Sequence, residues 1–369
     1  MVSVFMPGLE LNRQFFIGVV RPLLTARFPD LAYSAGLLGY GSDVLGYDTD
    51  VSTDHEWGPR LLLFLSEQDY PALAQTISNT FQHELPPTFH GYSTNFSAPN
   101  VDDGGVRIMT PGTPGQINHH ITIVTLADFL EWELGVRSVD IVTNHDWLTF
   151  PEQKLLELTA GAVYHDGLGS LTPLRARLEY HPREVWLYRL ASQWQRISQE
   201  EAFVGRCAAI GDDLGSRIVA ARLVREIMRL CFLLERRYTP YSKWFGTAFA
   251  RLTCAERLSP LLADTLAASN LKEREQPLAQ AYEAVASMQN ALAVAEPQDP
   301  VSRPYHGRPY RVIHAERFAQ TLAAAVQAED LRRIIGDIGL VGAVDQFVDS
   351  TDVLSEAGRC RRMVRFLGI

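Results

Sequence analysis

The sequence predicts an α+β protein, with a small mixed β-sheet domain followed by a helical bundle domain. Over residues 1–146, short apolar runs separated by turn residues alternate with helical patterns, which is typical of a sheet backed by helices. From Pro151 onward apolar residues recur at helical spacing, and a proline-rich stretch at 296–309 separates a C-terminal piece. The expected parts are the sheet domain at 1–146, the helical bundle at 147–295, and a C-terminal loop and helical segment packed on the bundle at 296–369.

The composition is that of an ordinary globular protein and argues against two kinds of partner. The 369 residues are 46% hydrophobic and 21% charged, so no long disordered region is expected. A formal net charge of −9 argues against a general nucleic-acid binder, because affinity for a polyanion comes mainly from Lys and Arg. No apolar run approaches the roughly 18 residues of a membrane helix, and the N-terminus lacks a basic signal-peptide region. Four widely spaced cysteines without a C-x-x-C pair are typical of reduced thiols, so we expect a cytoplasmic protein. The sequence does not predict the oligomeric state.

The elements of the first domain follow from the spacing of its apolar residues. Residues 9–28 have helical spacing, and Pro22 is expected to kink or break that helix. In the last strand the polar residues His120 and Thr122 alternate with isoleucines, so these two side chains share one face. The expected order is helix 9–28, strand 33–38, strand 60–65, helix 69–85, strand 88–97, a loop over 98–115, and strand 119–125.

The rest of the chain is predicted to be helical. Pro151 fits the first turn of a helix, and Gly161 fits its end. The segment 215–237 has apolar residues at helical spacing along its length, which suits a helix buried in the middle of a bundle. The expected helices cover residues 151–160, 182–197, 199–209, 215–237, 241–252, 258–268, 272–292 and 315–328.

The stretch 38–65, LGYGSDVLGYDTDVSTDHEWGPRLLLFL, holds the main candidate site. Gly41 allows a phosphate to approach the backbone closely, and Ser42 can give it a hydroxyl hydrogen bond. Asp54 and Glu56 stand at alternate positions entering the strand, where side chains two apart point to the same side. The two carboxylates are therefore expected to converge on one point, as Mg²⁺ requires of its hard oxygen ligands.

A competing pair of acids with the same spacing is Asp48 and Asp50. We prefer the later pair because it lies next to the apolar strand, whereas the earlier pair lies in a loop of Gly, Ser, Thr and Asp. Gly58 and Pro59 interrupt the pattern directly after the preferred pair. Because proline removes a ladder donor, the strand is expected to begin at a bulge or to lie on an edge.

Two basic residues are candidate partners for phosphate. Lys243 follows the aromatic segment 238–241 at the start of a helix, where it would neutralise a triphosphate with help from the helix N-terminus. The alternative is a surface lysine beside an aromatic cluster. Arg60 would contact phosphate from the second strand, or it would simply pair with one of the loop carboxylates.

The order of a Gly-Ser turn, a loop, and then acid-x-acid before the next strand resembles the signature of the nucleotidyltransferase superfamily, whose small members include the kanamycin and lincosamide nucleotidyltransferases. The resemblance implies that Gly41 and Ser42 hold the β and γ phosphates of a nucleotide, and that Asp54 and Glu56 are metal ligands. The residue between the acids is usually aliphatic in the superfamily, and here it is His55.

The superfamily usually has a third acid on a later strand, beside the metal pair. The corresponding face here has His120 and no obvious carboxylate, so His120 is the candidate base, since a neutral imidazole can take a hydroxyl proton near pH 7. The alternative is that His119 and His120 form a polar strand face at the rim of the cleft. Asp128 and Asp140 are possible replacements that the strand assignment disfavours.

A narrower resemblance covers nearly the whole chain. The segments 52–60, 238–246 and 345–352 resemble an uncharacterised domain-of-unknown-function branch of the same superfamily. This likeness implies the fold, a sheet region followed by a helical bundle, but it implies no substrate.

The expected function is that of an enzyme. It would be a Mg²⁺-dependent nucleotidyltransferase that moves a nucleoside monophosphate from ATP or another NTP to a small-molecule acceptor and releases pyrophosphate. The expected catalytic residues are Asp54, Glu56 and His120, and those that bind the nucleotide are Gly41, Ser42, Arg60 and Lys243. The alternative, motivated by the missing third acid, is a non-catalytic nucleotide-binding or regulatory protein with a degenerate site.

Overall fold

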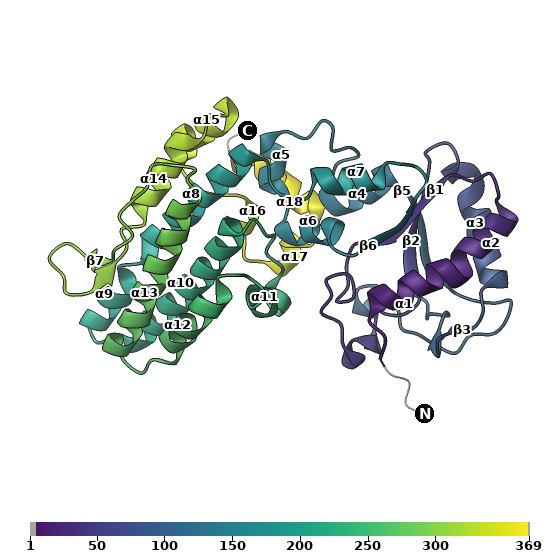
Figure 1. Ribbon diagram of the computed structural model, residues 1–369, viewed down its shortest axis with the longest axis horizontal. Coiled ribbons are helices and arrows are strands. Elements are labelled where there is room, and N and C mark those ends of the chain that lie inside the picture. Colours follow the sequence, from purple (N-terminus) through teal and green to yellow (C-terminus); the bar gives the residue numbers. More distant parts are fainter. Residues whose placement is uncertain (1–4, 368–369) are drawn as a thin grey trace. The chain divides into compact units, whose positions relative to one another are not determined.

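The computed structural model describes residues 5–367, which form the mixed α+β fold that the sequence predicts. The chain divides into two compact units, one formed by residues 1–141 with 154–179 and the other by residues 142–153 with 180–369. The first unit contains a small sheet with helices, and the second is almost entirely helical (Figure 1). The segment 154–179, which we expected in the helical bundle, therefore belongs to the sheet unit.

The first unit is built on a four-stranded sheet with the order β5-β2-β1-β6. β1 is antiparallel to both of its neighbours, and β2 is parallel to β5. Three strands therefore run in one direction, and only β1 runs in the other. The strands are β1 Tyr33–Leu37, β2 Arg60–Leu65, β5 His120–Thr125 and β6 Ala162–Asp166.

This topology defines two ends of the sheet, at which different strands begin and finish. The end of β1 and the starts of β2 and β5 lie together, and Arg60 is the register partner of His120. The loop that contains Gly41 follows β1 directly, so we call this the Gly41 end. β2, β5 and β6 finish at the opposite end, which we call the Thr125 end.

Helices cover both faces of the sheet (Figure 1). α1, α2 and α3 share an apolar core with alternate residues of β2, namely Leu61, Leu63 and Leu65. On the other face Phe64 packs edge-on against Phe129 of α4, with ring centroids 5.3 Å apart. The helices of this unit are α1 Gly8–Phe15, the π-helical turn η1 Phe16–Val20, α2 Arg21–Arg27, α3 Tyr70–Glu84, α4 Leu126–Leu134, most of α6 Glu152–Thr159, and α7 Leu171–Arg177.

The structure differs from the expected strands at two points. The segment 88–97 is not a strand of the sheet but contains the hairpin β3 Thr88–Phe89 and β4 Tyr92–Ser93, because His90 and Gly91 take φ of 48° and 85° and reverse the chain. The fourth strand of the sheet is instead β6, a segment to which we assigned no element. The break expected near Pro22 is present, since η1 separates α1 from α2.

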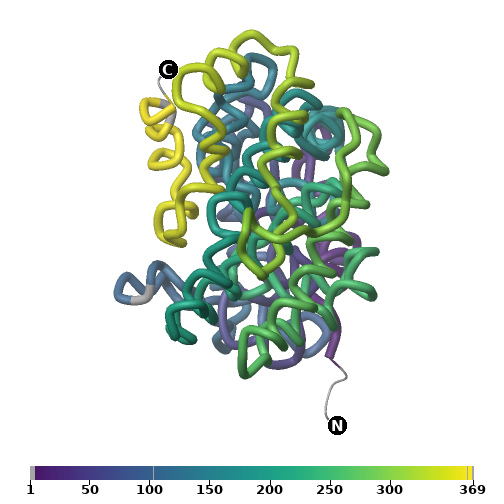
Figure 2. The backbone as a smooth tube through the Cα atoms, turned by 90° about the vertical axis from the view of Figure 1, so that its left-hand side faces the viewer, coloured from purple at the N-terminus to yellow at the C-terminus, as the bar shows by residue number. Residues whose placement is uncertain are grey.

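The second unit is helical, as expected. α10 is its long central helix, and Leu223, Ile227 and Leu230 are among its fully buried residues. The last elements of the chain are α18 Ala357–Arg362 and η4 Met363–Arg365, which pack back on α5 Asn144–Thr149. The yellow part of the tube in Figure 2 follows this segment. No helix among residues 5–367 combines the length and the apolar character needed to cross a bilayer.

The helices expected between residues 182 and 328 are present, whereas the helices at 144–149 and beyond residue 328 were not expected. A short hairpin lies beside the proline-rich stretch, with strands β7 Arg303–Pro304 and β8 Arg311–Val312. The helices are α5 Asn144–Thr149, α8 Arg183–Glu200, α9 Phe203–Ala209, α10 Asp213–Leu234, α11 Ser242–Phe249, α12 Ala255–Ala267, α13 Leu271–Ala291, α14 Glu316–Ala325, α15 Glu329–Ile338, α16 Val344–Phe347, α17 Thr351–Leu354, α18 Ala357–Arg362 and the 3-10 turn η4 Met363–Arg365.

Gly161, which joins α6 to β6, allows a testable prediction. A Cβ atom there would lie 2.0 Å from the Leu37 carbonyl oxygen, whereas at Gly169, which has nearly the same positive φ, it would meet nothing within 4 Å. We expect Gly161→Ala to lower the unfolding free energy by about 3 kcal/mol, roughly 1 from the left-handed backbone and the rest from the collision. Gly169→Ala should cost only the backbone part. Equal melting temperatures for the two variants would contradict this account.

Candidate functional site

The Gly41 end of the sheet is built around a buried ion pair between Asp43 and Arg60. The Arg60 Nη2 and Nε atoms donate to the two Asp43 carboxylate oxygens at 2.7 and 3.3 Å, and the residues are 5% and 1% exposed. Burial alone would lower the pKa of Arg60, but the Asp43 carboxylate outweighs burial and raises that pKa. Of the two roles that the sequence allowed Arg60, the structure shows the pairing with a loop carboxylate.

Gly41 closes over this ion pair. Its φ is 126°, and a Cβ atom would lie 2.3 Å from both Arg60 Nη2 and Asp43 Oδ1, so a side chain does not fit. Arg60 Nη2 also donates to the Tyr40 carbonyl oxygen at 2.8 Å, which fixes the backbone just before the glycine. Ser42 follows, half-buried, and its hydroxyl has no hydrogen-bond partner among the residues that the structure describes. That hydroxyl is available to a ligand.

Glu56 connects the loop after β1 with β5. Its Oε2 atom accepts hydrogen bonds from the Tyr40 hydroxyl at 2.9 Å and from His120 Nε2 at 2.8 Å, and its Oε1 atom accepts from the Arg107 backbone N–H at 2.6 Å. Because an ionised carboxylate can only accept, His120 Nε2 carries the hydrogen in this contact. Burial would raise the pKa of Glu56, but the bonds from His120 and Tyr40 lower it to about 2.

His120 is a buried, oriented imidazole. It is 8% exposed, and its ring meets Phe96 edge-on with centroids 4.8 Å apart. Burial lowers the pKa of His120 below its usual 6.5, although Glu56 acts in the opposite direction. The ring is therefore neutral at pH 7 with its Nδ1 lone pair open to a proton. His119 does not share this face, since its Nε2 atom lies 3.1 Å from the Ser78 hydroxyl on α3.

The expectation that Asp54 and Glu56 enter a strand is wrong. Asp54 ends the 3-10 helix η2 Asp50–Asp54, and β2 begins only at Arg60. Between them Glu56 and Gly58 take φ of 48° and 132°, so the chain is not extended and side chains two apart need not share a side. The expected edge position or bulge is also wrong, because β2 pairs regularly on both sides.

The two proposed metal ligands have different partners. The Asp54 side chain is 67% exposed, and its Oδ1 atom lies 2.9 Å from His55 Nδ1. Glu56 is 15% exposed and faces His120. Within residues 5–367 no group of three or more His, Cys, Asp or Glu side chains is arranged to hold a metal ion. The metal assignment stays a prediction.

The competing acids have structural roles. Asp48 Oδ2 accepts from the Gly8 N–H at 2.7 Å and from Trp57 Nε1 at 3.0 Å, which anchors the start of α1. Trp57 itself is 2% exposed, so its ring is part of the core. Asp50 is exposed, and its Oδ1 atom accepts from the Val51 N–H next to it.

The remaining candidates belong to other elements of the chain. Lys243 belongs to the second unit, where it is exposed in the first turn of α11 and its Nζ atom lies 5.0 Å from the centre of the Trp244 ring. Asp128 and Asp140 follow β5 and lie at the Thr125 end, where they pair with Arg137 and Arg177. Neither acid replaces the missing third carboxylate beside Glu56.

Three residues of the site were missed in the sequence. In the sequence Tyr40 is only an aromatic residue between two glycines, and Asp43 is one of several acids in the same loop, so neither was marked as a site residue. Arg107 lies in the glycine-rich and proline-rich stretch after the hairpin, where no periodicity marks its position. Its backbone contacts Glu56 only because the tertiary fold brings two distant loops together.

Comparison with known proteins gives a family match over part of the chain. Residues 147–245 match the family described as "Domain of unknown function (DUF4037)". No curated protein and no solved structure gives a significant match. The matched region begins after His120 in the sequence, so it contains none of Ser42, Glu56 and His120 and assigns them no role.

The buried ion pair should be sensitive to loss of one charge. We expect Asp43→Asn to lower the unfolding free energy by about 3–5 kcal/mol, because it leaves the Arg60 guanidinium buried without its counter-charge. Adding Arg60→Gln should recover much of that loss. Asp140→Asn is the matched control, since the Asp140–Arg177 pair is exposed and should contribute less than about 1 kcal/mol. A urea titration in which the two single variants behave alike would disprove the role given to Asp43.

The Glu56–His120 contact predicts a pKa change that NMR can follow. Glu56→Gln should lower the pKa of His120 further, because the carboxylate that favours the imidazolium is lost. Asp54→Asn should leave it unchanged. The pKa values of His120 and Glu56 are both lower in the folded state than in the unfolded state. The contribution of His120 to the unfolding free energy is therefore fully present above pH 6.5, and that of Glu56 above pH 4.5. Both contributions are lost as the pH falls. A rise in the His120 pKa in Glu56→Gln would contradict the assignment.

Proposed function

We propose that the chain is a nucleotidyltransferase that binds a nucleoside triphosphate at the Gly41 end of the sheet and transfers its nucleoside monophosphate to a small-molecule acceptor. One observation supports this most strongly. The Gly41-Ser42 turn, Glu56 and His120 come from separate segments, yet they lie at the same end of the sheet. The resemblance of the order Gly-Ser and then acid-x-acid to the nucleotidyltransferase superfamily adds to it.

The phosphates would bind at the turn after β1. Gly41 has no side chain to block their approach, and the Ser42 hydroxyl is free to donate. Arg60 would hold the turn in shape instead of touching phosphate, because its donors face Asp43 and Tyr40. The role of Lys243 in binding the triphosphate stays a prediction from the sequence.

In this proposal a Mg²⁺ ion arrives with its nucleotide and takes Asp54 and Glu56 as its protein ligands. Mg²⁺ keeps several waters and uses phosphate oxygens, so one or two protein carboxylates suffice. Asp54 is exposed enough to turn toward such an ion, and Glu56 keeps acceptor capacity beyond its three hydrogen bonds. When bound there, the ion would offset the negative charge that develops on the phosphates.

His120 would act as the base for the acceptor. Glu56 holds the Nε2–H, which leaves Nδ1 to take the proton of an acceptor hydroxyl or amine. The acceptor atom would form a bond to the α-phosphorus while the bond from that phosphorus to the bridging oxygen breaks, and pyrophosphate would leave in line. In this proposal Glu56 and Tyr40 position the imidazole.

A second candidate function is nucleotide binding without turnover. Two observations favour it. β5 has no carboxylate between His120 and Thr125, and the oxygens of Glu56 already accept three hydrogen bonds. A protein of this kind would sense a nucleotide, and it would release no pyrophosphate with any acceptor.

Calorimetry with a non-hydrolysable ATP analogue and Mg²⁺ tests the proposed binding. We expect saturable binding that weakens by about tenfold or more in the double variant Asp54→Asn with Glu56→Gln, because two charged ligands are lost. Asp50→Asn is the matched control, an exposed acid of the same loop, and should bind as the parent does. Unchanged affinity in the double variant would refute the metal assignment.

A screen for pyrophosphate release with hydroxylated and amino acceptors separates the two candidate functions. Turnover that is lost in His120→Gln while nucleotide affinity is kept would support the transferase. Binding without release for every acceptor would favour the sensor, and absence of nucleotide binding would contradict both.

A further inference from the structure

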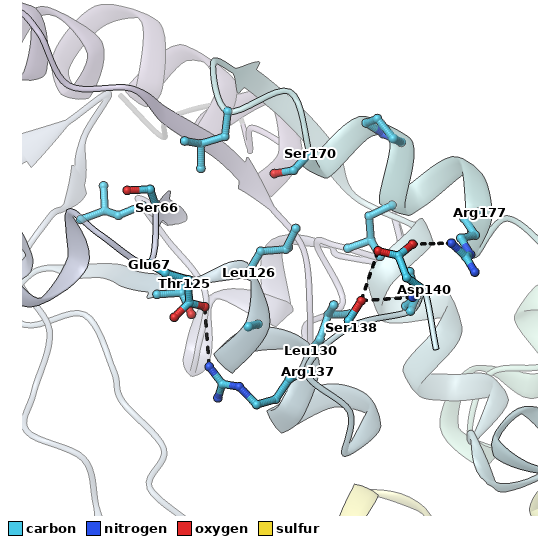
Figure 3. Close-up of a pocket in the computed structure, with 16 residues that line it drawn as sticks. Ser66, Glu67, Thr125, Leu126, Leu130, Arg137, Ser138, Asp140, Ser170 and Arg177 are labelled. Carbon is cyan, nitrogen blue, oxygen red and sulfur yellow. Dashed lines mark hydrogen bonds and ion pairs between the residues drawn. The ribbon is translucent and has the colours of Figure 1, made fainter. Parts of the chain in front are cut away.

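A cavity of about 580 Å³ lies at the Thr125 end of the sheet. It is lined where β2, β5 and β6 finish and by the first turns of α4 and α7 (Figure 3). Its volume falls within the range of small-molecule sites, which is roughly 300–1,000 Å³. Open sheets commonly bind ligands outside the carboxyl ends of parallel strands, and three strands of this sheet end here in the same direction.

This cavity is separate from the proposed nucleotide site. β2 runs from the Gly41 end to the cavity, and its six residues span about 17 Å at the usual rise of a strand. A small molecule in the cavity therefore cannot reach Ser42 or His120. Whatever binds here is neither the nucleotide nor the acceptor of the transfer proposed above.

The wall of the cavity is mostly apolar. Leucines from three segments form it, including Leu126 and Leu130 of α4, Leu168 after β6, and Leu174 of α7. Ala127, in the first turn of α4, contributes a methyl group to this wall. Such a wall favours a ligand with an apolar body.

The charged groups at the margin are two arginines, Arg137 and Arg177, and each pairs with an acid that also lines the cavity, Glu67 and Asp140 respectively (Figure 3). Arg177 uses Nη1 to pair with Asp140, and one bond of this kind leaves most of the five N–H donors of a guanidinium for another acceptor (Figure 3). Ser170 precedes α7 without a side-chain capping bond, so its hydroxyl is also available. Arg137 lies on the opposite margin, paired with Asp128 and Glu131.

We infer that the cavity is a second ligand site that takes a small carboxylic acid with an apolar body. The carboxylate would accept from the unused N–H groups of Arg177, and the apolar part would lie against the leucines.

Calorimetry of the full chain with hexanoate, hexylamine and hexanol tests the inference without any nucleotide, so its result is independent of the proposed transfer. We expect hexanoate to bind at one saturable site, and the amine and the alcohol to bind at least about tenfold more weakly, because only the carboxylate pairs with the guanidinium. Absent hexanoate binding, or equal binding of the three probes, would overturn the inference.

Variants locate the site. Arg177→Gln should weaken hexanoate binding by about tenfold, and Ala127→Trp should abolish it by filling the cavity. Arg27→Gln is the matched control, because Arg27 also makes an exposed ion pair, with Glu84, but does not line the cavity. Melting curves establish that each variant is folded. If Ala127→Trp does not fold, Ser170→Trp is used in its place. Full hexanoate affinity in the folded tryptophan variant, or in Arg177→Gln, would exclude this cavity as the site.

Discussion

The loop after β1 depends on one buried ion pair, Asp43 with Arg60. Two charges removed from water are tolerated only when each satisfies the other, and the Arg60 guanidinium also donates to the Tyr40 carbonyl oxygen. The Tyr40 ring lies 5.2 Å from that guanidinium, and its hydroxyl donates to Glu56, which in turn accepts from His120. A continuous series of contacts therefore fixes the turn, the acid and the imidazole relative to one another.

Much of the fold could be predicted because periodic apolar residues mark long elements. The bounds of β2, 60–65, agree with the structure, since the apolar run is preceded by proline and followed by a polar residue. β6 was missed because its sequence, AVYHD, has neither alternating apolar and polar residues nor a long apolar run. This agrees with its burial, since all five residues are half-buried. The segment 88–97 has the composition of a strand, but Gly91 takes a positive φ and makes it a hairpin.

The sequence could predict which end of the sheet has the candidate site, but not which carboxylates meet there. Antiparallel pairing of β1 with β2 brings the Gly-Ser turn close to the start of β2, and order along the chain suffices to expect this. Asp43 differs in no local way from the other acids of its loop, and it is selected only because Arg60 reaches it from another strand. The alternation argument for Asp54 and Glu56 needs an extended backbone, which the φ of 48° at Glu56 excludes.

The central claim is that a nucleotide binds at the Gly41 end of the sheet. The most direct measurement is the change in backbone amide NMR shifts when the full chain is titrated with Mg²⁺ and a non-hydrolysable ATP analogue. The account predicts the largest changes at Gly41, Ser42 and His120, with Leu65 and Thr125 nearly unchanged. Largest changes at the Thr125 end, or changes confined to the second unit, would contradict it.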